Sequence, residues 1–547
     1  MNMQRDGIAP NAGRLLWAGF FAILAAGVGF SVRAGCVDQW RLLFGFTDQQ
    51  IGTLNTALFI GFCFGIILGG LVCDRLGYRL LIIAAFAFHV VSSGSPFLAS
   101  PDDPALAYRI LYWGTFVFGL ANGTLEAVAN PLVATLFPNH RTHYLNLLHA
   151  SWPAGMVVGG LTTYLFGSSI GWQVLLVVFL VPTMFYGILF FGQTMPKSEA
   201  QRSGLSFGAM FRDVGLLGAA VICLLLSQFF GDVLGAPSGV AYGIAGALLV
   251  AAGVLTQFSP GSWLLFALFV AHLLIGAVEL GTDSWIGNIT GNILTPAQGQ
   301  ILFVFTSAIM FALRFCAGTI ERLGLSPVGI LLVSAVLACV GLNMTAGIET
   351  FFGAMLALTI YAVGKTFFWP TMLAVASDRF PRTGAIAISL MGGIGMLSAG
   401  LVGGPGLGYA KDRFAGAELR SSAPELQAQY EAKGSSQWLV FAEVKGIDGK
   451  QLGAINEKLK AARETLSKQG VNDPSKGLEQ LTAEERKVIA ASIAGDRHTL
   501  RADSVIPATM AVIYLLLALW FRTQGGYRVL RIGKDGAVEA APPAHGG

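Results

Sequence analysis

Residues 124–155 read TLEAVANPLVATLFPNHRTHYLNLLHASWPAG, which are two apolar runs joined by a short basic turn. The first run carries Glu126 and Asn130, whose spacing of four residues places both side chains on one face of a helix. The second run carries three polar or aromatic residues at steps of three: Asn146, His149 and Trp152. Two membrane-length helices with matched polar stripes predict two walls of a polar path through a membrane.

The composition of the whole chain fits this interpretation. Of the 547 residues, 54% are hydrophobic and only 12% are charged. Soluble domains carry about 25% charged residues. Long apolar segments follow one another from about residue 14 to residue 410. The chain is therefore predicted to be an all-α polytopic membrane protein.

The apolar runs predict about fourteen membrane helices of some twenty residues or more. We expect them near residues 14–42, 49–73, 80–99, 106–136, 143–167, 172–194, 213–234, 238–258, 262–291, 297–319, 327–347, 350–377, 383–408 and 504–522. Arginine and lysine gather on one set of loops, which should face the cytoplasm. Both termini are then cytoplasmic, in a plasma membrane that we expect to be a bacterial inner membrane.

Internal repetition predicts two related halves. The stretch GLVCDRLG at residues 70–77 recurs as AGTIERLG at residues 317–324. Pro131 and Pro370 each follow an ionisable residue by five positions, Glu126 in one half and Lys365 in the other. Two parallel six-helix halves, related by an axis along the membrane normal, explain both matches.

This organisation predicts six units along the chain. They are an N-terminal half at 1–195, a linker with two extra membrane helices at 196–260, the first five helices of a C-terminal half at 261–410, a polar extracytoplasmic insertion at 411–503, a last membrane helix at 504–523 and a cytoplasmic tail at 524–547.

The GxxxDRxG pattern at residues 70–77 resembles the signature of the major facilitator superfamily. More narrowly, residues 125–131, 145–149 and 152–155 are similar to the L-E-x-x-x-N-P and L-N-L stretches of the fucose–proton symporter family of sugar carriers. The resemblance implies two halves that rock about a central site and carry a small polar solute of the sugar class. It also implies proton coupling.

Two departures from the family pattern affect the expected site. His149 and Trp152 stand where the family has glutamine and asparagine. Arg33 aligns with an acidic residue that couples protons in the fucose carriers. We therefore expect Glu126 either to carry the proton or to pair with Arg33, and Arg33 either to form that pair or to hold an anionic substrate.

The remaining charged candidates lie in the predicted C-terminal half. Glu279 and Asp283 are one turn apart and share a predicted helix face with His272. They are expected to bind a proton or cation, or to form a gate or a helix-end ion pair. Lys365 is expected to pair with Glu279 or to contact the substrate. Thr359 stands where a phosphate-binding loop ending in Gly-Lys-Thr would need glycine, which argues against that motif.

Aromatic side chains near the polar positions could stack on the apolar faces of a sugar, and Trp152 and Trp369 are the main candidates. The predicted substrate-binding residues are Asn130, Asn146, His149, Trp152, Glu279, Lys365 and Trp369. A conformational latch between helix ends is predicted from Asp74, Arg75, Arg79, Glu321 and Arg322.

Two rival functions remain open beside a proton-coupled sugar carrier. One is a carrier of organic anions or sugar acids, which would use Arg33 and Lys365 as counter-charges. The other is a receptor or sensor that signals through residues 411–503. An enzyme is not expected, because the sequence shows no nucleophile constellation, metal-ligand spacing or nucleotide loop. We expect no cofactor or metal and no nucleic-acid partner, only the solute, protons and lipid, with the chain a monomer.

Overall fold

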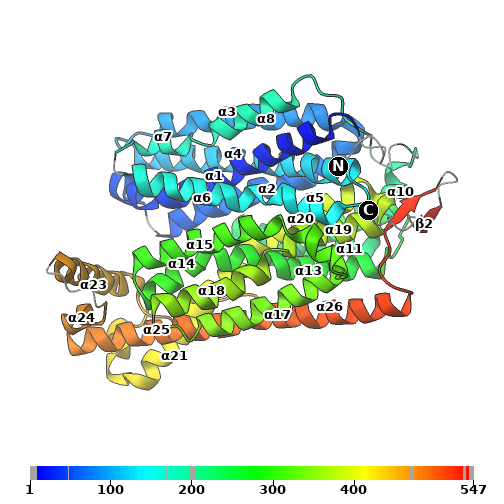
Figure 1. Cartoon of the computed structure of the whole chain (residues 1–547). Coiled ribbons are helices and arrows are strands. Elements are labelled where there is room, and N and C mark those ends of the chain that lie inside the picture. The colour runs from blue at the N-terminus through cyan, green and yellow to red at the C-terminus, as the bar shows by residue number, and fades with distance from the viewer. Residues whose placement is uncertain are drawn as a thin grey trace.

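Inside a membrane every backbone N–H and C=O group must be satisfied within the chain, so long apolar runs fold as helices. The computed structural model describes residues 9–46, 48–167, 169–197, 202, 204–468, 474–533 and 537–540. Within these residues the apolar runs form two helical bundles that lie side by side (Figure 1). The ends of the predicted first and last units, residues 1–8 and 541–547, lie outside this description.

The first bundle contains the helices of the N-terminal half. They are α1 (Ala12–Phe44), α2 (Asp48–Leu76), α3 (Tyr78–Leu98), α4 (Pro104–Leu136), α5 (Arg141–His149), α6 (Ser151–Phe166), α7 (Trp172–Leu176) and α8 (Leu180–Phe190). The pairs α5–α6 and α7–α8 each make one interrupted crossing.

The second bundle contains the helices of the C-terminal half. They are α13 (Trp263–Ile275), η3 (Gly276–Gly281), α14 (Thr282–Ile293), α15 (Pro296–Arg314), α16 (Ala317–Arg322), α17 (Pro327–Thr345), α18 (Phe351–Lys365), α19 (Phe368–Arg379), η4 (Pro381–Thr383), α20 (Ala385–Ser398), η5 (Ala399–Gly403), α21 (Gly404–Ser422), α25 (Ala483–Asp503) and α26 (Val505–Thr523).

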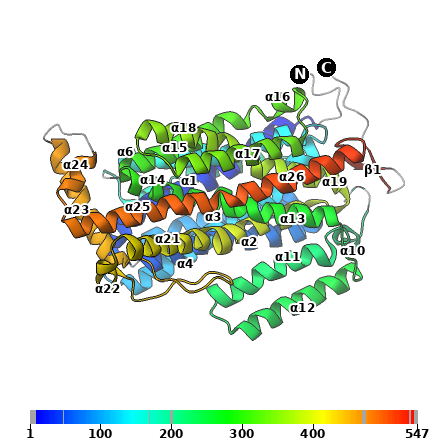
Figure 2. The ribbon, with the colours of Figure 1, turned by 90° about the horizontal axis from the view of Figure 1, so that it is seen from below.

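An extra helix pair lies on the flank of the second bundle (Figure 2). It consists of α10 (Phe207–Phe211), α11 (Gly215–Gln228), η2 (Phe229–Val233) and α12 (Ser238–Thr256). The outer helix α12 exposes most of its apolar side chains, as expected for a helix that faces lipid.

By length and apolar composition, twelve helices among the described residues qualify as membrane spans. Two further crossings, α4 and the pair α5–α6, run alongside them in Figure 1. Asn122, Glu126 and Asn130 lower the hydropathy of α4, and the break after His149 shortens α5 and α6. The predicted all-α membrane fold of two six-helix halves plus an extra pair is therefore confirmed.

Glycines bring the backbones of α2 and α4 into direct contact. A Cβ atom on Gly65 would lie 2.3 Å from the carbonyl oxygen of Leu120, and one on Gly123 would lie 2.0 Å from that of Phe62. Such close approach is typical of helix pairs in membranes. It fixes the position of the polar stripe on α4 within the bundle.

The polar segment after residue 411 is built on the membrane helices themselves. Helix α21 continues the eleventh crossing of the two halves outward, and α25 leads directly into the last helix α26. Between them lie η6 (Pro424–Leu426), α22 (Gln427–Tyr430), α23 (Gly449–Lys468) and α24 (Pro474–Glu479), around a small apolar core that includes Leu419, Leu459 and Val488. The exact limits of the six predicted units stay predictions.

The two ends of the bundle differ in what they carry (Figure 1). One end carries the start of α1 and an antiparallel hairpin of β1 (Leu530–Ile532) and β2 (Val538–Ala540), and we call it the terminal end. The other carries α22 to α24, and we call it the insertion end.

Candidate functional site

Three helices are interrupted where the two halves face each other. α5 ends at His149, α18 ends at Lys365, and the π-helical turn η3 separates α13 from α14. Broken helices at the middle of a membrane protein leave backbone groups that side chains or ligands must satisfy. The interruptions therefore mark the place where a polar site can form.

A chain of hydrogen bonds joins the polar stripes of α4 and α5. Asn130 Nδ2 donates to Glu126 Oε2 at 3.3 Å, and Asn130 Oδ1 lies 2.8 Å from His149 Nε2. All three side chains are buried, with Glu126 only 3% exposed. The sequence spacing predicted that they would share a surface, and the structure brings them together.

Arg314, at the end of α15, connects this chain to the opposite half. Its guanidinium donates to Glu279 Oε1 at 3.1 Å, to the carbonyl of Thr366 at 3.0 Å and to the carbonyl of His149. The two carbonyls belong to the breaks after α18 and α5, so one cation satisfies both interruptions. Sequence analysis missed this residue, although a charge within a predicted membrane helix is the same signal that singled out Glu126.

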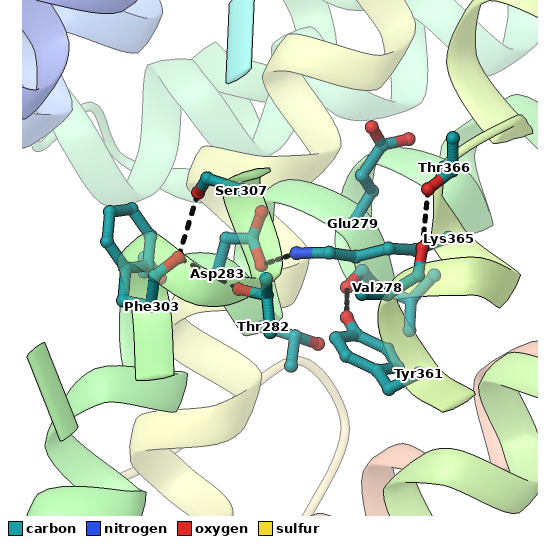
Figure 3. A network of polar contacts seen from close by, with 12 residues as sticks. Val278, Glu279, Thr282, Asp283, Phe303, Ser307, Tyr361, Lys365 and Thr366 are labelled. Atoms are coloured by element: carbon teal, nitrogen blue, oxygen red, sulfur yellow. Dashed lines mark hydrogen bonds and ion pairs between the residues drawn. The ribbon is translucent and has the colours of Figure 1, made fainter. Parts of the chain in front are cut away.

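The expected pairing of Lys365 with Glu279 is wrong. Lys365 Nζ forms a buried ion pair with Asp283, while Glu279 pairs with Arg314. Figure 3 shows the carboxylate of Glu279 projecting away from the Lys365 ammonium. The i→i+5 bonding of η3 inserts an extra residue into the turn, so Glu279 and Asp283 do not share the face that regular helical spacing predicts.

A network of backbone and hydroxyl contacts surrounds this ion pair (Figure 3). Tyr361 Oη donates to the carbonyl of Val278 at 3.0 Å, and the Lys365 ammonium lies 5.1 Å from the centre of the Tyr361 ring. Thr282 Oγ1 donates to Asp503 Oδ2 at 2.6 Å. The ion pair is therefore held within the C-terminal half and does not cross to the N-terminal half.

The predicted substrate residue Asn146 makes a second link between the halves. Its Nδ2 donates to the Thr142 carbonyl at 2.8 Å and to Thr371 Oγ1 on α19 at 3.1 Å. Its Oδ1 atom is buried and has no hydrogen-bond partner among the described residues. This acceptor is available to a ligand that enters between the halves.

The two predicted tryptophans lie on opposite halves. Trp152 packs against Phe30 and Phe62 with ring centroids 5.6 and 6.3 Å away. Trp369 is buried beside His272, with ring centroids 4.6 Å apart. Among the described residues, Trp369 Nε1 and both ring nitrogens of His272 lack hydrogen-bond partners. Each half thus supplies an aromatic surface, and the C-terminal half adds uncommitted polar atoms.

Arg33 does not pair with Glu126. Its guanidinium stacks on the Phe118 ring at 3.8 Å and donates to the Gly29 carbonyl at 3.0 Å, inside the N-terminal half. Phe118 precedes Glu126 by eight residues on α4, which is about 12 Å along the helix. A separate buried cluster around His89, bonded to Asn122 and Tyr186, lies next to this arginine.

The predicted latch residues divide into two groups. Asp74 accepts a hydrogen bond from the backbone N–H of Ala385 at 3.1 Å, and Glu321 accepts one from Thr142, so both connect the halves at the terminal end. For the other three, the described contacts do not join the two halves. Arg75 stacks on Phe207, Arg79 lines a groove between α3 and α8, and Arg322 donates to a carbonyl of its own helix.

Sequence analysis missed a buried ion pair at the terminal end. Arg141 on α5 pairs with Asp378 on α19 at 3.3 Å, and both side chains are buried. Tyr527 Oη donates to the same carboxylate at 2.8 Å. Arg531 of β1 bonds to Asn139 in the N-terminal half, so the tail also bridges the two bundles. In the sequence, Arg141 lies in the short basic turn between the two apolar runs of residues 124–155, a position that gives no indication of its partner.

Candidate metal ligands do not cluster in the described part of the chain. A search of those residues for three or more neighbouring His, Cys, Asp or Glu side chains finds no such group. The site between the halves is instead made of ion pairs, amides, an imidazole and indoles. These groups can bind hydroxyls, a proton or an anion.

Residues 15–405 match the Major Facilitator Superfamily. The chain belongs to this family. It is accordingly a membrane transporter and not an enzyme. In fold, it is similar to the proton:xylose symporter XylE from E. coli, with a TM-score of 0.53 at 15% identity over 71% of this chain and 86% of that one.

Curated relatives match over shorter stretches. A hexuronate transporter of Bacillus subtilis is 27% identical over 151 residues, and a putative niacin/nicotinamide transporter of the same organism is 32% identical over 157. The L-fucose-proton symporter of Escherichia coli is 26% identical over 123 residues. These alignments cover 27%, 28% and 22% of this chain, and 34%, 36% and 27% of the respective relatives.

Proposed function

We propose that this transporter couples the movement of a small hydroxylated solute, of the sugar class, to protons carried by Glu126. The observation that carries the proposal is the environment of that carboxyl group. Glu126 is buried and makes no ion pair among the described residues, and its hydrogen bond comes from the neutral amide of Asn130. It can gain or lose a proton without leaving a bonded cation unpaired.

The other two acids of the site are less suited to this role. Glu279 and Asp283 pair with Arg314 and Lys365, respectively. Neutralising one member of a buried ion pair strands the charge of the other, which costs about 3–5 kcal/mol. Glu126 avoids that cost, and two hydrogen bonds through Asn130 connect it to His149.

The polar groups without internal partners support a hydroxylated solute. Asn146 Oδ1 can accept a hydroxyl hydrogen, and Trp369 Nε1 can donate to an oxygen. The rings of Trp152 and Trp369 offer apolar faces, one from each half. Two of the curated relatives carry a hexuronate and L-fucose, which supports a sugar or a sugar acid.

The proton role is tested by Glu126→Gln in proteoliposomes. We expect the variant to lose accumulation driven by a pH gradient while retaining solute exchange across the membrane, because exchange needs no net proton transfer. The matched control is Glu425→Gln, which changes an exposed acid at the insertion end. Normal accumulation of the solute by Glu126→Gln under a pH gradient would contradict the proposal.

A sugar acid is the second candidate, favoured by Arg314 at the contact between the halves and by the hexuronate relative. A thermal-shift screen of neutral sugars against the corresponding sugar acids distinguishes the two, because a ligand that binds the folded protein raises its apparent Tm. Stabilisation by acids alone would favour the anion, and stabilisation by neutral sugars would favour the first candidate.

We also propose that the terminal end faces the cytoplasm. Arg75, Arg79, Arg141, Arg322 and Arg379 lie at this end, and positive charge favours the cytoplasmic side. Single cysteines at Ser435 and Thr523, on opposite ends, test the orientation through labelling of intact cells. Labelling of the Thr523 site by a membrane-impermeant reagent, with none at Ser435, would reverse the assignment.

A further inference from the structure

Residues 431–447 of the insertion form a narrow hairpin, which we call the finger. Two isolated bridges pair its arms, Glu431 with Ile447 and Ser436 with Val444. The chain reverses at Leu439 and Val440, where Phe441 N–H donates to the Trp438 carbonyl at 3.0 Å. Leu439 adopts a φ of +49°, a left-handed conformation that is uncommon for a non-glycine residue.

The finger runs back along α21 towards the membrane (Figure 2). Its contacts with α21 descend in order: the Lys445 carbonyl meets Gly416, Ser436 bonds Asp412, Tyr409 Oη donates to the Ala442 carbonyl at 2.8 Å, and the Trp438 ring covers Gly406. From position 416 to position 406, the helix rise gives a descent of about 15 Å. The apex, which we define as Leu439 to Phe441, follows Trp438 at the turn of the hairpin.

The length of the crossing helix places its membrane boundary near the finger. Helices α20, η5 and α21 continue one another from Ala385 at the terminal end. A hydrocarbon layer of about 30 Å takes roughly twenty helical residues, which would end close to Gly406. The first charged residue along this helix is Lys411, one turn further out. Trp438 and Tyr409 therefore lie at the level where aromatic residues gather at membrane surfaces.

The apex of the finger is apolar and exposed. Leu439, Val440 and Phe441 are 45%, 95% and 43% exposed. Residues 434–442 carry no charge, although lysine and glutamate flank them at 433 and 443. The ring of Phe441 stacks on that of Trp438, which precedes the apex, with centroids 5.2 Å apart and the planes nearly parallel. Phe441 also packs against Tyr409, with ring centroids 6.0 Å apart, whereas Leu439 and Val440 extend from the turn into the surroundings of the protein.

We propose that the apex of the finger, Leu439 to Phe441, inserts into the boundary between lipid headgroups and acyl chains at the insertion end. The descending contacts along α21 carry its apex to the membrane level, and the uncharged apolar apex fits a lipid surface better than water. The adjacent extra helix pair also presents apolar side chains outward, so this flank of the C-terminal half faces lipid. The finger anchors the insertion to the bilayer.

Site-directed fluorescence tests the proposal on the full chain in proteoliposomes. Val440→Cys, in a background with the exposed Cys316 changed to serine, is labelled with an environment-sensitive fluorophore. Ser435→Cys is the control, because Ser435 is exposed on the same finger near the level of Asp412. We expect blue-shifted emission and quenching by brominated lipid at position 440, and quenching by aqueous iodide at position 435.

The quenching results distinguish an apex in lipid from an apex in water or against protein. Iodide quenching at position 440 equal to that at position 435, without an effect of brominated lipid, would show that the apex lies in water and overturn the proposal. Protection from both quenchers would place a protein surface over the apex, such as a second copy, and would also overturn it. The change at Val440 is mild because its side chain makes few contacts, so a folded variant is expected.

Discussion

Changing Arg314 to methionine removes the cation that links the two halves at the centre of the molecule. Methionine preserves much of the side-chain length but none of the donors. The change leaves the carbonyls of His149 and Thr366 without their partner and leaves Glu279 buried without its cation. The expected result is a strongly destabilised transporter.

The magnitude follows from the burial of the pair. Removing one member of a buried ion pair costs about 3–5 kcal/mol, because the remaining charge stays in a poorly solvated site. Glu279→Gln in the Arg314→Met background removes that stranded charge. The double variant should therefore recover part of the loss, with a coupling between the two sites on the order of 1–3 kcal/mol.

Thermal unfolding of the purified variants in detergent measures their order of stability. The apparent Tm should be highest for the natural chain, intermediate for the double variant and lowest for Arg314→Met. Arg501→Met is the matched control, because it removes an exposed arginine from α25. Two results would contradict this prediction. One is an apparent Tm of Arg314→Met equal to that of the control, and the other is a double variant with a lower apparent Tm than Arg314→Met alone.

Three further predictions concern the other polar contacts. Lys365→Gln should lower the apparent Tm by stranding Asp283, and adding Asp283→Asn should restore part of it; an unchanged Tm in the single variant would contradict the buried pair. Arg141→Ala should loosen the terminal end by removing the bond to Asp378, seen as faster labelling of cysteines there, and unchanged labelling would contradict it. Burial between the halves raises the pKa of Glu321 from 4.5 to about 7, so bringing the halves together at the terminal end binds a proton; this contact is most favoured below pH 4.5, weakens as the pH rises to 7 and depends little on pH above that. Glu321→Gln should remove that pH dependence from the same labelling assay, and a dependence that persists would assign it to another group.

The helix faces could be predicted wherever regular α-helical spacing holds. Glu126 and Asn130 lie four residues apart on α4 and form the expected contact, and His149 joins them from α5. The cost of a buried charge directed attention to these positions from sequence alone. The same argument applies to Arg314, whose charge within a predicted membrane helix also marks a polar site.

The pairing of charges could not be predicted from the repeat. The repeat relates Lys365 to Glu126, and the expected partner of Lys365 was Glu279, but the π-helical turn at 276–281 shifts the residues that follow and presents Asp283 instead. A helical face also cannot be assigned without knowing the neighbouring helices. Arg33 turns into the interior of the N-terminal half, onto Phe118, because the aromatic rings there accept its guanidinium.

The polar character of the contact between the halves bears on how the transporter can move. Several of the described contacts that join the halves lie between the membrane centre and the terminal end. Four of them are Arg314 to the His149 carbonyl, Asn146 to Thr371, Arg141 to Asp378, and Ala385 N–H to Asp74. A hydrogen bond contributes about 0.5–1.5 kcal/mol net, and one to a charged group about 1.5–3, so these four, three of which involve a charged group, are worth on the order of 5–10 kcal/mol together. A differential affinity of about 5.5 kcal/mol moves a two-state equilibrium from 1:99 to 99:1. The contacts between the halves are therefore of the same magnitude as the binding energy that a solute bonding to Asn146 and a proton on Glu126 would need to supply. An apolar contact of equal energy would contain no hydrogen bonds that a polar solute could replace.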